Sequence, residues 1–338
     1  MTVQENVSLQ NYNTFGLAVN ARYFLEAEGI VDIRCILKDP KFSSLPMLIL
    51  GGGSNLLFTK DFDGIVVKID IKGIQKVKED PDFVWIKAGA GEIWHDLVLY
   101  TIEQGYGGLE NLSLIPGTVG AAPMQNIGAY GVEIKDTFEE LEAINVSDGA
   151  MRTFNHAECE FAYRHSIFKG SLKDQFIISS VTFKLRKNPV FNTSYGDIRE
   201  TLDKAGIKKL SLKAISNAIV QIRQSKLPDP AKIGNAGSFF KNPSIGKELF
   251  DQLKMQYPSM PGYDQPENKI KVPAGWLIEH CGWKGKTIGN VGVHDNQALV
   301  LVNRGGAQGA EVKELAEAIV KSVNEKFGIA LTPEVNIV

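Results

Sequence analysis

The sequence predicts an α+β fold in two parts. Short β-branched runs bounded by turn residues dominate the chain from residue 46 to residue 185. From residue 197 the apolar residues recur at helical spacing instead. The chain has 338 residues, whereas one domain usually holds roughly 150. We therefore predict a first domain over residues 1–188 and a second, smaller α+β domain over residues 189–338.

The first part reads as a sheet domain covered by one helix. Strands are predicted over residues 46–50, 64–69, 83–88, 141–146 and 175–185. A helix is predicted over residues 92–104, where apolar residues follow a helical period and Gly105 provides the stop. Between these elements, residues 105–131 form a long glycine-rich stretch without regular pattern, which is typical of a functional segment.

The second part begins with two amphipathic helices, predicted over residues 198–205 and 211–224. The second helix leads directly into a proline-bounded loop at residue 226. Beyond that loop the sequence predicts a helix over 245–255, a polar segment over 258–271, a strand over 298–302 and a long helix over 309–327.

Composition excludes several classes of protein. The formal net charge is -2 with a pI near 6.3, and opposite charges are interspersed, so no field exists to collect nucleic acid. Cys35, Cys159 and Cys281 are widely separated and form no Cys-x-x-Cys pair, which disfavours disulfides and thiolate zinc sites. We find neither a signal sequence nor an apolar run of about 18 residues, so we expect a soluble cytoplasmic protein that binds no membrane.

Two glycine-rich segments, residues 51–55 and 116–131, offer successive backbone N–H groups that could surround a pyrophosphate. The Gly-x-Gly-x-x-Gly fingerprint is absent after the strand at 46–50, and His280 stands where a P-loop at Gly285 would need glycine. Tight turns between strands remain an equal alternative. The five histidines show no metal-ligand spacing and no Gly-x-Ser-x-Gly elbow occurs, so we predict no metal site and no hydrolase.

Residues 226–230 (Lys-Leu-Pro-Asp-Pro) and 235–243 (Asn-Ala-Gly-Ser-Phe-Phe-Lys-Asn-Pro) combine donors, fixed charge and restricted backbone. This combination suits an anionic ligand, with an ordinary surface turn as the alternative. Read together with residues 51–55, 116–120, 125–131, 163–164, 194–196 and 333–334, these motifs closely resemble the UDP-N-acetylenolpyruvoylglucosamine reductase family over nearly the whole chain. Residues 70–82, 186–212 and 243–262 match no pattern of the family.

The resemblance implies an FAD-binding domain of the vanillyl-alcohol-oxidase (PCMH) type, followed by a substrate domain whose C-terminal segment returns to the active site. It implies NADPH as the reductant of FAD and UDP-N-acetylglucosamine enolpyruvate as the acceptor in peptidoglycan precursor synthesis. Tyr263 lies in a polar loop similar to the mobile lid of one family branch. We also expect a monomer.

The resemblance assigns roles residue by residue. Arg164 would stabilise developing carboxylate charge, Ser238 would donate a proton, and Glu334 would assist. The expected cofactor residues are Gly51, Gly52, Gly53, Ser54, Asn55, Pro116, Gly117, Thr118, Gly120, Gln125, Asn126, Gly128, Tyr130 and Arg223. The expected substrate residues are Tyr163, Tyr195, Lys226, Asn242, Tyr263, Lys271 and Gln297.

Two other functions would use the same loops. An FAD-dependent oxidase of the same fold would act on a sugar or alcohol and return electrons to oxygen. No histidine or cysteine that could tether a flavin lies in residues 51–55 or 116–131, and the Ser238 loop would have no function there. A non-catalytic nucleotide-sugar binding module would need the loops without a proton donor, so Ser238→Ala would change no rate.

Overall fold

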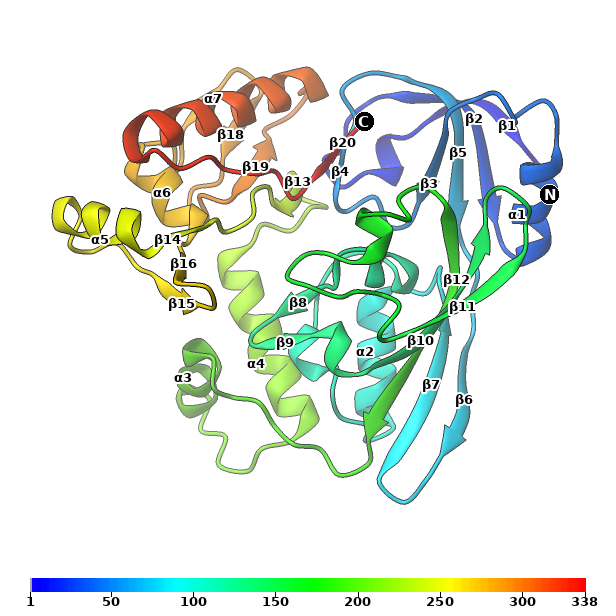
Figure 1. Ribbon diagram of the computed structural model, residues 1–338, viewed down its shortest axis with the longest axis horizontal. Helices are drawn as coiled ribbons and strands as arrows, with labels where there is room; N and C mark the ends of the chain where they lie inside the picture. Colours follow the sequence, from blue (N-terminus) through cyan, green and yellow to red (C-terminus); the bar gives the residue numbers. More distant parts are fainter. Residues whose placement is uncertain (1) are drawn as a thin grey trace. The chain divides into compact units, whose positions relative to one another are not determined.

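The structure, a computed structural model, describes residues 2–338 and divides them into two compact units (Figure 1). Unit 1 consists of residues up to Val7, Ala21–Gly53 and Phe62–Ser225. Unit 2 consists of Ser8–Asn20, Ser54–Asp61 and Lys226–Val338. The boundary after residue 188 that the sequence suggested thus differs from the division of the structure, which keeps residues 189–225 with unit 1.

Unit 1 contains two large sheets and one small hairpin. The first has the order β1-β2-β5-β3, and β5 pairs in parallel with both β2 and β3. The second is antiparallel with the order β11-β10-β12-β7-β6, and its long strands run side by side in Figure 1. The strands are β1 (Gln4–Ser8), β2 (Asn20–Ala27), β3 (Met47–Leu50), β5 (Phe62–Ile69), β6 (Ile74–Glu79), β7 (Phe83–Gly89), β10 (Phe138–Asn145), β11 (Met151–Asn155) and β12 (Phe176–Arg186).

The helices of unit 1 each bury apolar residues on one side. The unit 1 helices are α1 (Ile30–Lys38), α2 (Trp94–Glu103), α3 (Gly196–Lys204) and α4 (Leu212–Lys226), the last ending in the first residue of unit 2. In α2, Trp94, Leu97 and Val98 are buried in the main core. Gly105 then adopts a φ of 76° just past the helix end, which confirms the predicted glycine stop.

A smaller apolar cluster joins α3 to α4. Ile198 and Leu202 of α3 meet Ile215, Ile219 and other apolar residues of α4. Tyr130 and Phe191 pack against this cluster from outside the two helices. The cluster explains why α3 and α4, which follow the last strand of unit 1, belong to that unit.

The irregular stretch predicted over 105–131 is built from short 3-10 turns and a small hairpin. The turns are η2 (Glu110–Leu112), η3 (Val119–Ala121) and η4 (Pro123–Gln125). The hairpin pairs β8 (Gly128–Ala129) with β9 (Val132–Glu133), and η5 (Ile134–Asp136) follows it. The second glycine-rich segment, residues 116–131, is therefore built from short turns and a hairpin and contains no long helix or strand.

Unit 2 holds an antiparallel sheet of order β13-β19-β18-β17, a three-stranded sheet of order β14-β16-β15 and a parallel pair β20-β4. Its strands are β4 (Leu56–Leu57), β13 (Gly234–Ser238), β14 (Ser244–Gly246), β15 (Tyr263–Gln265), β16 (Lys269–Lys271), β17 (Thr287–Ile288), β18 (Val291–Val293), β19 (Val300–Asn303) and β20 (Asn336–Ile337). Its helices are α5 (Lys247–Gln256), α6 (Ala274–His280) and α7 (Gly309–Phe327). Figure 1 shows α7, in red, beside β18 and β19.

Helix α7 confirms the strongest helix prediction. Val312, Leu315 and Ala316, followed by Ile319 and Val323, bury one stripe in the unit 2 core. Gly328 ends the helix in the left-handed region with a φ of 65°, and its N–H donates to the Asn324 carbonyl at 2.8 Å. Among the described residues, no helix has both the length and the apolar character needed to span a membrane.

Candidate active site

The two glycine-rich segments meet within unit 1. A Cβ atom on Gly51 would lie 2.6 Å from Thr118 Oγ1, and one on Gly52 would lie 2.8 Å from Gly117 Cα. A Cβ on Gly120 would lie 2.6 Å from the Ala90 Cβ. These distances leave no room for a side chain at the three glycines, and Gly52 and Gly117 bring their backbones close together. Closely spaced glycine backbones of this kind suit a pyrophosphate.

The second glycine segment is fixed to the loop before α2. The Gly117 carbonyl accepts the Trp94 N–H at 3.1 Å, and the Gly120 N–H donates to the Ala90 carbonyl at 2.9 Å. These bonds hold the segment in place without using its side chains. The glycines present therefore fit a dinucleotide with a diphosphate bridge, and their role in binding it stays a prediction.

Not every predicted cofactor residue has a free side chain. The buried Asn126 amide donates to Glu133 Oε2 at 3.0 Å and to the Ala162 carbonyl at 3.1 Å, and its Oδ1 accepts the Lys135 N–H. Gln125 Oε1 accepts a hydrogen bond from Lys169 at 3.2 Å. The side chain of Asn126 is thus a structural brace of the loop, and only its backbone remains for a ligand.

Arg164 lies in a two-residue turn that sets its backbone in the left-handed region. Ala162 and His165 exchange backbone hydrogen bonds of 3.1 Å in both directions, and Arg164 between them has a φ of 53°. Its Nη2 donates to the Gly128 carbonyl at 2.8 Å, and its guanidinium lies 5.3 Å from the Tyr163 ring centroid. A strained non-glycine residue of this kind is a recognised mark of functional sites.

A second guanidinium, Arg223 of α4, lies near the first. Burial lowers the pKa of Arg223, the Tyr130 hydroxyl opposes that effect, and the positive charge of Arg164 adds to it. Arg223 Nε donates to the Leu114 carbonyl at 3.2 Å. Since arginine stays charged in proteins, unit 1 presents two positive charges beside Tyr130, which suits an anionic ligand or a developing negative charge.

The carbonyl that holds Arg223 belongs to a strained residue, Leu114, with a φ of 57°. The N–H of Leu114 donates to His95 Nδ1 at 3.0 Å. Burial lowers the pKa of His95, Asp96 opposes this and Arg223 adds to it. Sequence reasoning missed this role of His95, because nothing in its local pattern points to residue 114.

In unit 2, a bulge directs Ser238. The register between β13 and β19 shifts between Asn235 and Ser238, and Gly237 adopts a φ of 68°. Asn235 Oδ1 accepts the Gly237 N–H at 2.9 Å, which holds the bulge. The next residue, Phe239, is fully buried, so Ser238 is delivered by a fixed backbone. Bulges often re-aim a side chain beside a functional site.

Glu334 is brought next to this strand from the far end of the chain. Its N–H donates to the Phe239 carbonyl at 2.8 Å, and Phe240 forms a bridge with Pro333. The Glu334 carbonyl accepts the Asn55 side-chain amide at 3.2 Å. Two predicted catalytic residues, Ser238 and Glu334, and one predicted cofactor residue, Asn55, therefore gather in unit 2.

The predicted substrate residues of unit 2 have defined places. Tyr263 and Lys271 are direct partners across the β15-β16 ladder, and Tyr263 is 60% exposed. Asn242 Oδ1 accepts the Ala274 N–H at 2.9 Å and so caps the start of α6. Gln297 Oε1 accepts the Leu299 N–H at 3.4 Å. Lys226 stands at the end of α4.

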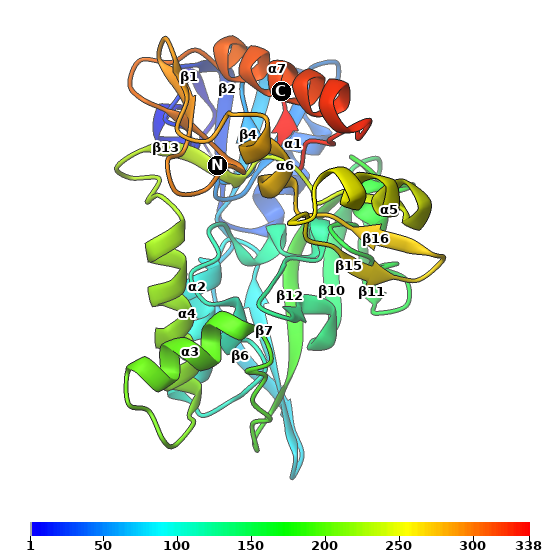
Figure 2. The same ribbon diagram turned by 90° about the vertical axis from the view of Figure 1, so that its left-hand side faces the viewer.

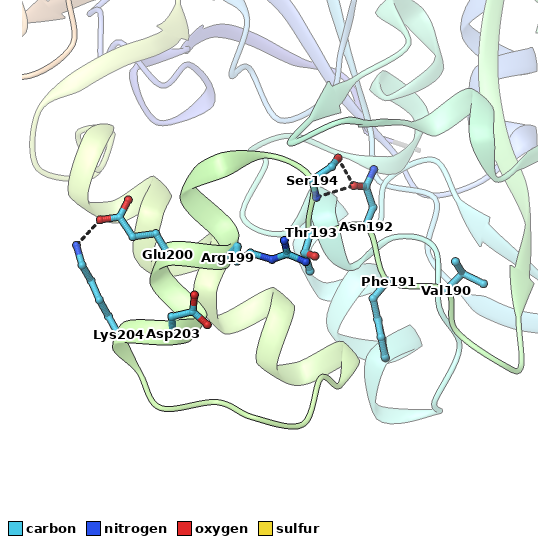
Figure 3. Close-up of a pocket in the computed structure, with 9 residues that line it drawn as sticks. All are labelled: Val190, Phe191, Asn192, Thr193, Ser194, Arg199, Glu200, Asp203 and Lys204. Atoms are coloured by element: carbon cyan, nitrogen blue, oxygen red, sulfur yellow. Dashed lines mark hydrogen bonds and ion pairs between the residues drawn. The ribbon is translucent and has the colours of Figure 1, made fainter.

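The remaining predicted substrate residues, Tyr163 and Tyr195, belong to unit 1. Tyr195 directly precedes α3, is half exposed, and meets the Tyr130 ring edge-to-face with centroids 5.7 Å apart. A surface pocket of about 950 Å³ runs along residues 190–194 and α3 (Figure 3). Arg164, Ser238 and Glu334 do not line that pocket. The volume of the pocket therefore does not identify the position of the predicted catalytic residues.

Comparisons with known proteins agree with this geometry. Residues 21–155 match the model of an FAD binding domain, and residues 229–338 match the C-terminal domain of UDP-N-acetylenolpyruvoylglucosamine reductase. Reductases of that name from Flavobacterium johnsoniae and Amoebophilus asiaticus are each 54% identical to the chain, over the full length of both proteins. The chain belongs to the UDP-N-acetylenolpyruvoylglucosamine reductase family.

A solved member of the family has the same fold. The crystal structure of the reductase from Thermus caldophilus matches with a TM-score of 0.69 and 25% identity, covering 100% of this chain and 99% of that one. The reductase from Pseudomonas putida is 48% identical over the whole of both chains. Membership confirms the predicted α+β fold and makes the chain an FAD-dependent oxidoreductase that uses FAD and NADPH.

Proposed function

We propose that this chain performs the two-step reaction of its family, in which NADPH is the electron source and Ser238 supplies the proton. The substrate is UDP-N-acetylglucosamine enolpyruvate and the product is UDP-N-acetylmuramate, a peptidoglycan precursor. The glycine cradle of residues 51–52 and 117–120 would hold FAD, which would supply hydride transfer from NADPH to the terminal methylene carbon of the enolpyruvyl group. The observation that supports the proposal is the bulge at Gly237, which leaves Ser238 partly exposed on a strand whose next residue bonds to Glu334.

Hydride addition leaves an electron pair on the carbon that bears the carboxylate, as an enolate. Ser238 donates its hydroxyl proton to that carbon, which forms the new C–H bond, and recovers a proton from solvent. A serine hydroxyl is a weak acid, but an enolate is a strong base, so the transfer is downhill. Arg164 stabilises the developing negative charge with its guanidinium fork, and Glu334 assists from beside Ser238.

The other binding residues form two groups, one for FAD and one for the nucleotide sugar. The backbones of Gly51, Gly52, Gly117 and Gly120 would hold the pyrophosphate of FAD, with Tyr130 and Arg223 nearby in unit 1. Tyr195, Lys226, Asn242, Tyr263, Lys271 and Gln297 would bind the nucleotide sugar, with Tyr263 on the β15-β16 hairpin as the lid. We further propose that the chain acts as a monomer in the cytoplasm.

The test separates the two half-reactions. In anaerobic stopped-flow experiments, NADPH should bleach the flavin of the Ser238→Ala variant at close to the wild-type rate, because the variant lacks only the proton donor. Return of the flavin colour with the enolpyruvyl sugar should slow by about 100-fold or more, the usual contribution of a positioned acid. Ser259→Ala, which removes an exposed hydroxyl of unit 2, is the control and should change neither rate.

Equal slowing of both half-reactions by Ser238→Ala would refute the assigned role. A wild-type protein whose colour returned with oxygen alone, and never with the sugar, would instead indicate the oxidase.

A further inference from the structure

Asn111 is a buried residue that the reaction scheme does not use. It lies on η2 with 1% of its surface exposed. Its side-chain amide donates to the Tyr130 carbonyl at 3.1 Å and to the Asn192 carbonyl at 3.0 Å. An asparagine amide nitrogen has two N–H groups, so both are committed, one to each of two segments distant in sequence.

Asn192 closes the connection from the other side. Its Nδ2 donates to the Gly131 carbonyl at 3.2 Å. Its Oδ1 accepts the Ser194 N–H at 3.2 Å and the Ser194 hydroxyl at 2.7 Å, as the dashed lines of Figure 3 show. The fit is close, because a Cβ on Gly131 would lie 3.2 Å from Asn192 Nδ2.

The two segments so joined carry different ligand residues. One ends in Tyr130 and Gly131, which adopt successive left-handed φ values of 50° and 78°. The other leads to Tyr195, whose ring meets that of Tyr130. Tyr195 is 53% exposed, so burial of its own side chain does not fix it. Besides this ring contact, the hydrogen bonds of Asn111 and Asn192 tie the backbone just before Tyr195 to the Tyr130 loop.

We propose that Asn111 is a positioning residue that clasps the Tyr195 segment onto the Tyr130 loop and thereby sets the affinity for the nucleotide sugar. The clasp consists of Asn111, Asn192 and the carbonyls of residues 130 and 131. Its effect on ligand affinity rests on the proposed function, since that assigns Tyr195 to the sugar nucleotide. The effect of the clasp on the order of residues 190–196 is independent of the proposed function.

The decisive variant is Asn111→Asp, which keeps the shape but points carboxylate oxygens at two carbonyl oxygens. In the flavin-loaded protein, amide hydrogen exchange at residues 190–196 should accelerate about tenfold or more. The dissociation constant for UDP-N-acetylglucosamine, measured calorimetrically, should rise about tenfold or more, as expected for the loss of two hydrogen bonds. Asn192→Ala should act in the same direction and serves if Asn111→Asp does not fold.

Ser113→Ala is the matched control. Ser113 follows η2 directly and is fully buried, and its hydroxyl bonds the Glu110 carbonyl and the Ser216 hydroxyl rather than the clasp. It should lower the melting temperature without changing exchange at 190–196 or sugar affinity. The clasp is overturned if Asn111→Asp or Asn192→Ala leaves both quantities at wild-type values, or if Ser113→Ala changes them equally.

Amide exchange and sugar affinity also distinguish failure of the clasp from failure of the proposed function. If exchange at 190–196 accelerates as expected but the wild-type protein has no measurable affinity for the sugar nucleotide, the clasp stands and the proposed substrate fails.

Discussion

Glu110 is a carboxylate placed where water hardly reaches it. It is 3% exposed, and its Oε2 accepts the Gly108 N–H at 2.6 Å. Burial raises the pKa of Glu110, and the backbone hydrogen bonds from Gly108 and from its own N–H partly oppose that effect. The folded protein therefore holds the proton of this side chain more tightly than the unfolded chain does.

A raised folded-state pKa gives a definite pH dependence. The stabilising contribution of Glu110 is fully present below its unfolded pKa of 4.5 and is lost as pH rises through the folded value. Glu110→Gln keeps an acceptor for Gly108 without a charge. We expect its melting temperature to exceed that of the wild type by a few degrees at about pH 8, with a smaller difference at about pH 5. Equal shifts at both pH values, or the same behaviour in the exposed Glu103→Gln control, would contradict this.

At the scale of elements, the cofactor cradle brings the backbones of two loops together at Gly52 and Gly117. A side chain on Gly52 would meet the Gly117 backbone, which cannot rotate away as a flexible side chain could. We therefore expect Gly52→Ala to weaken FAD binding by more than about tenfold, a cost of about 1.4 kcal/mol or more. The measurement is the dissociation constant of FAD, followed by flavin fluorescence.

Gly29→Ala is the control for this substitution, because a Cβ there would meet nothing within 4 Å and its φ of −155° suits any residue. Retention of full FAD affinity by Gly52→Ala would show that the two loops separate easily, contrary to the cradle.

The elements that the sequence predicted best are those with a long period or an unbroken apolar run. Helix α7 and strand β12 are of this kind, since burial of one helical stripe or of a whole strand leaves a repeated pattern. The β15-β16 hairpin was read as a polar segment, because three-residue strands leave no pattern. Its turn has positive φ at Glu267 and Asn268, and only the second of these residues favours that region.

The site was predicted as a set of residues but not as an arrangement. The family resemblance assigned roles to Ser238, Asn55 and Glu334, yet their grouping depends on hydrogen bonds that span up to 279 residues. Asn111 left no signal, because its partners at residues 130 and 192 are neither periodic nor adjacent. Local patterns record which face of an element is buried, and they do not record which distant backbone a buried amide holds.

For the whole molecule, the last residues of the chain complete unit 2. Strand β20 pairs with β4, and the Val338 carbonyl accepts both the N–H and the hydroxyl of Thr59. Removal of residues 336–338 should lower the melting temperature by several degrees, because it deletes several ladder hydrogen bonds. It should also slow reoxidation of the flavin by the sugar more than its reduction by NADPH, since Glu334 loses the support of its neighbours.

Calorimetry and single-turnover kinetics would measure both effects of this truncation. The control is Val338→Ala, which keeps the backbone ladder intact and should behave like the wild type. A truncated protein with unchanged melting temperature and rates would show that Glu334 is held adequately without residues 336–338.

The chain passes between the two units five times, after residues 7, 20, 53, 61 and 225. This threading has a consequence for protein synthesis. Leu57 is fully buried in unit 2. Thr59, two residues later, bonds to Val338, which follows it by 279 residues. At roughly 5–20 residues per second, a ribosome needs about 15–60 seconds to cover that interval. Unit 1 has all its residues long before unit 2 does, so we expect the early unit 2 segments to stay exposed to chaperones and proteases until their partners near residue 338 have been synthesised.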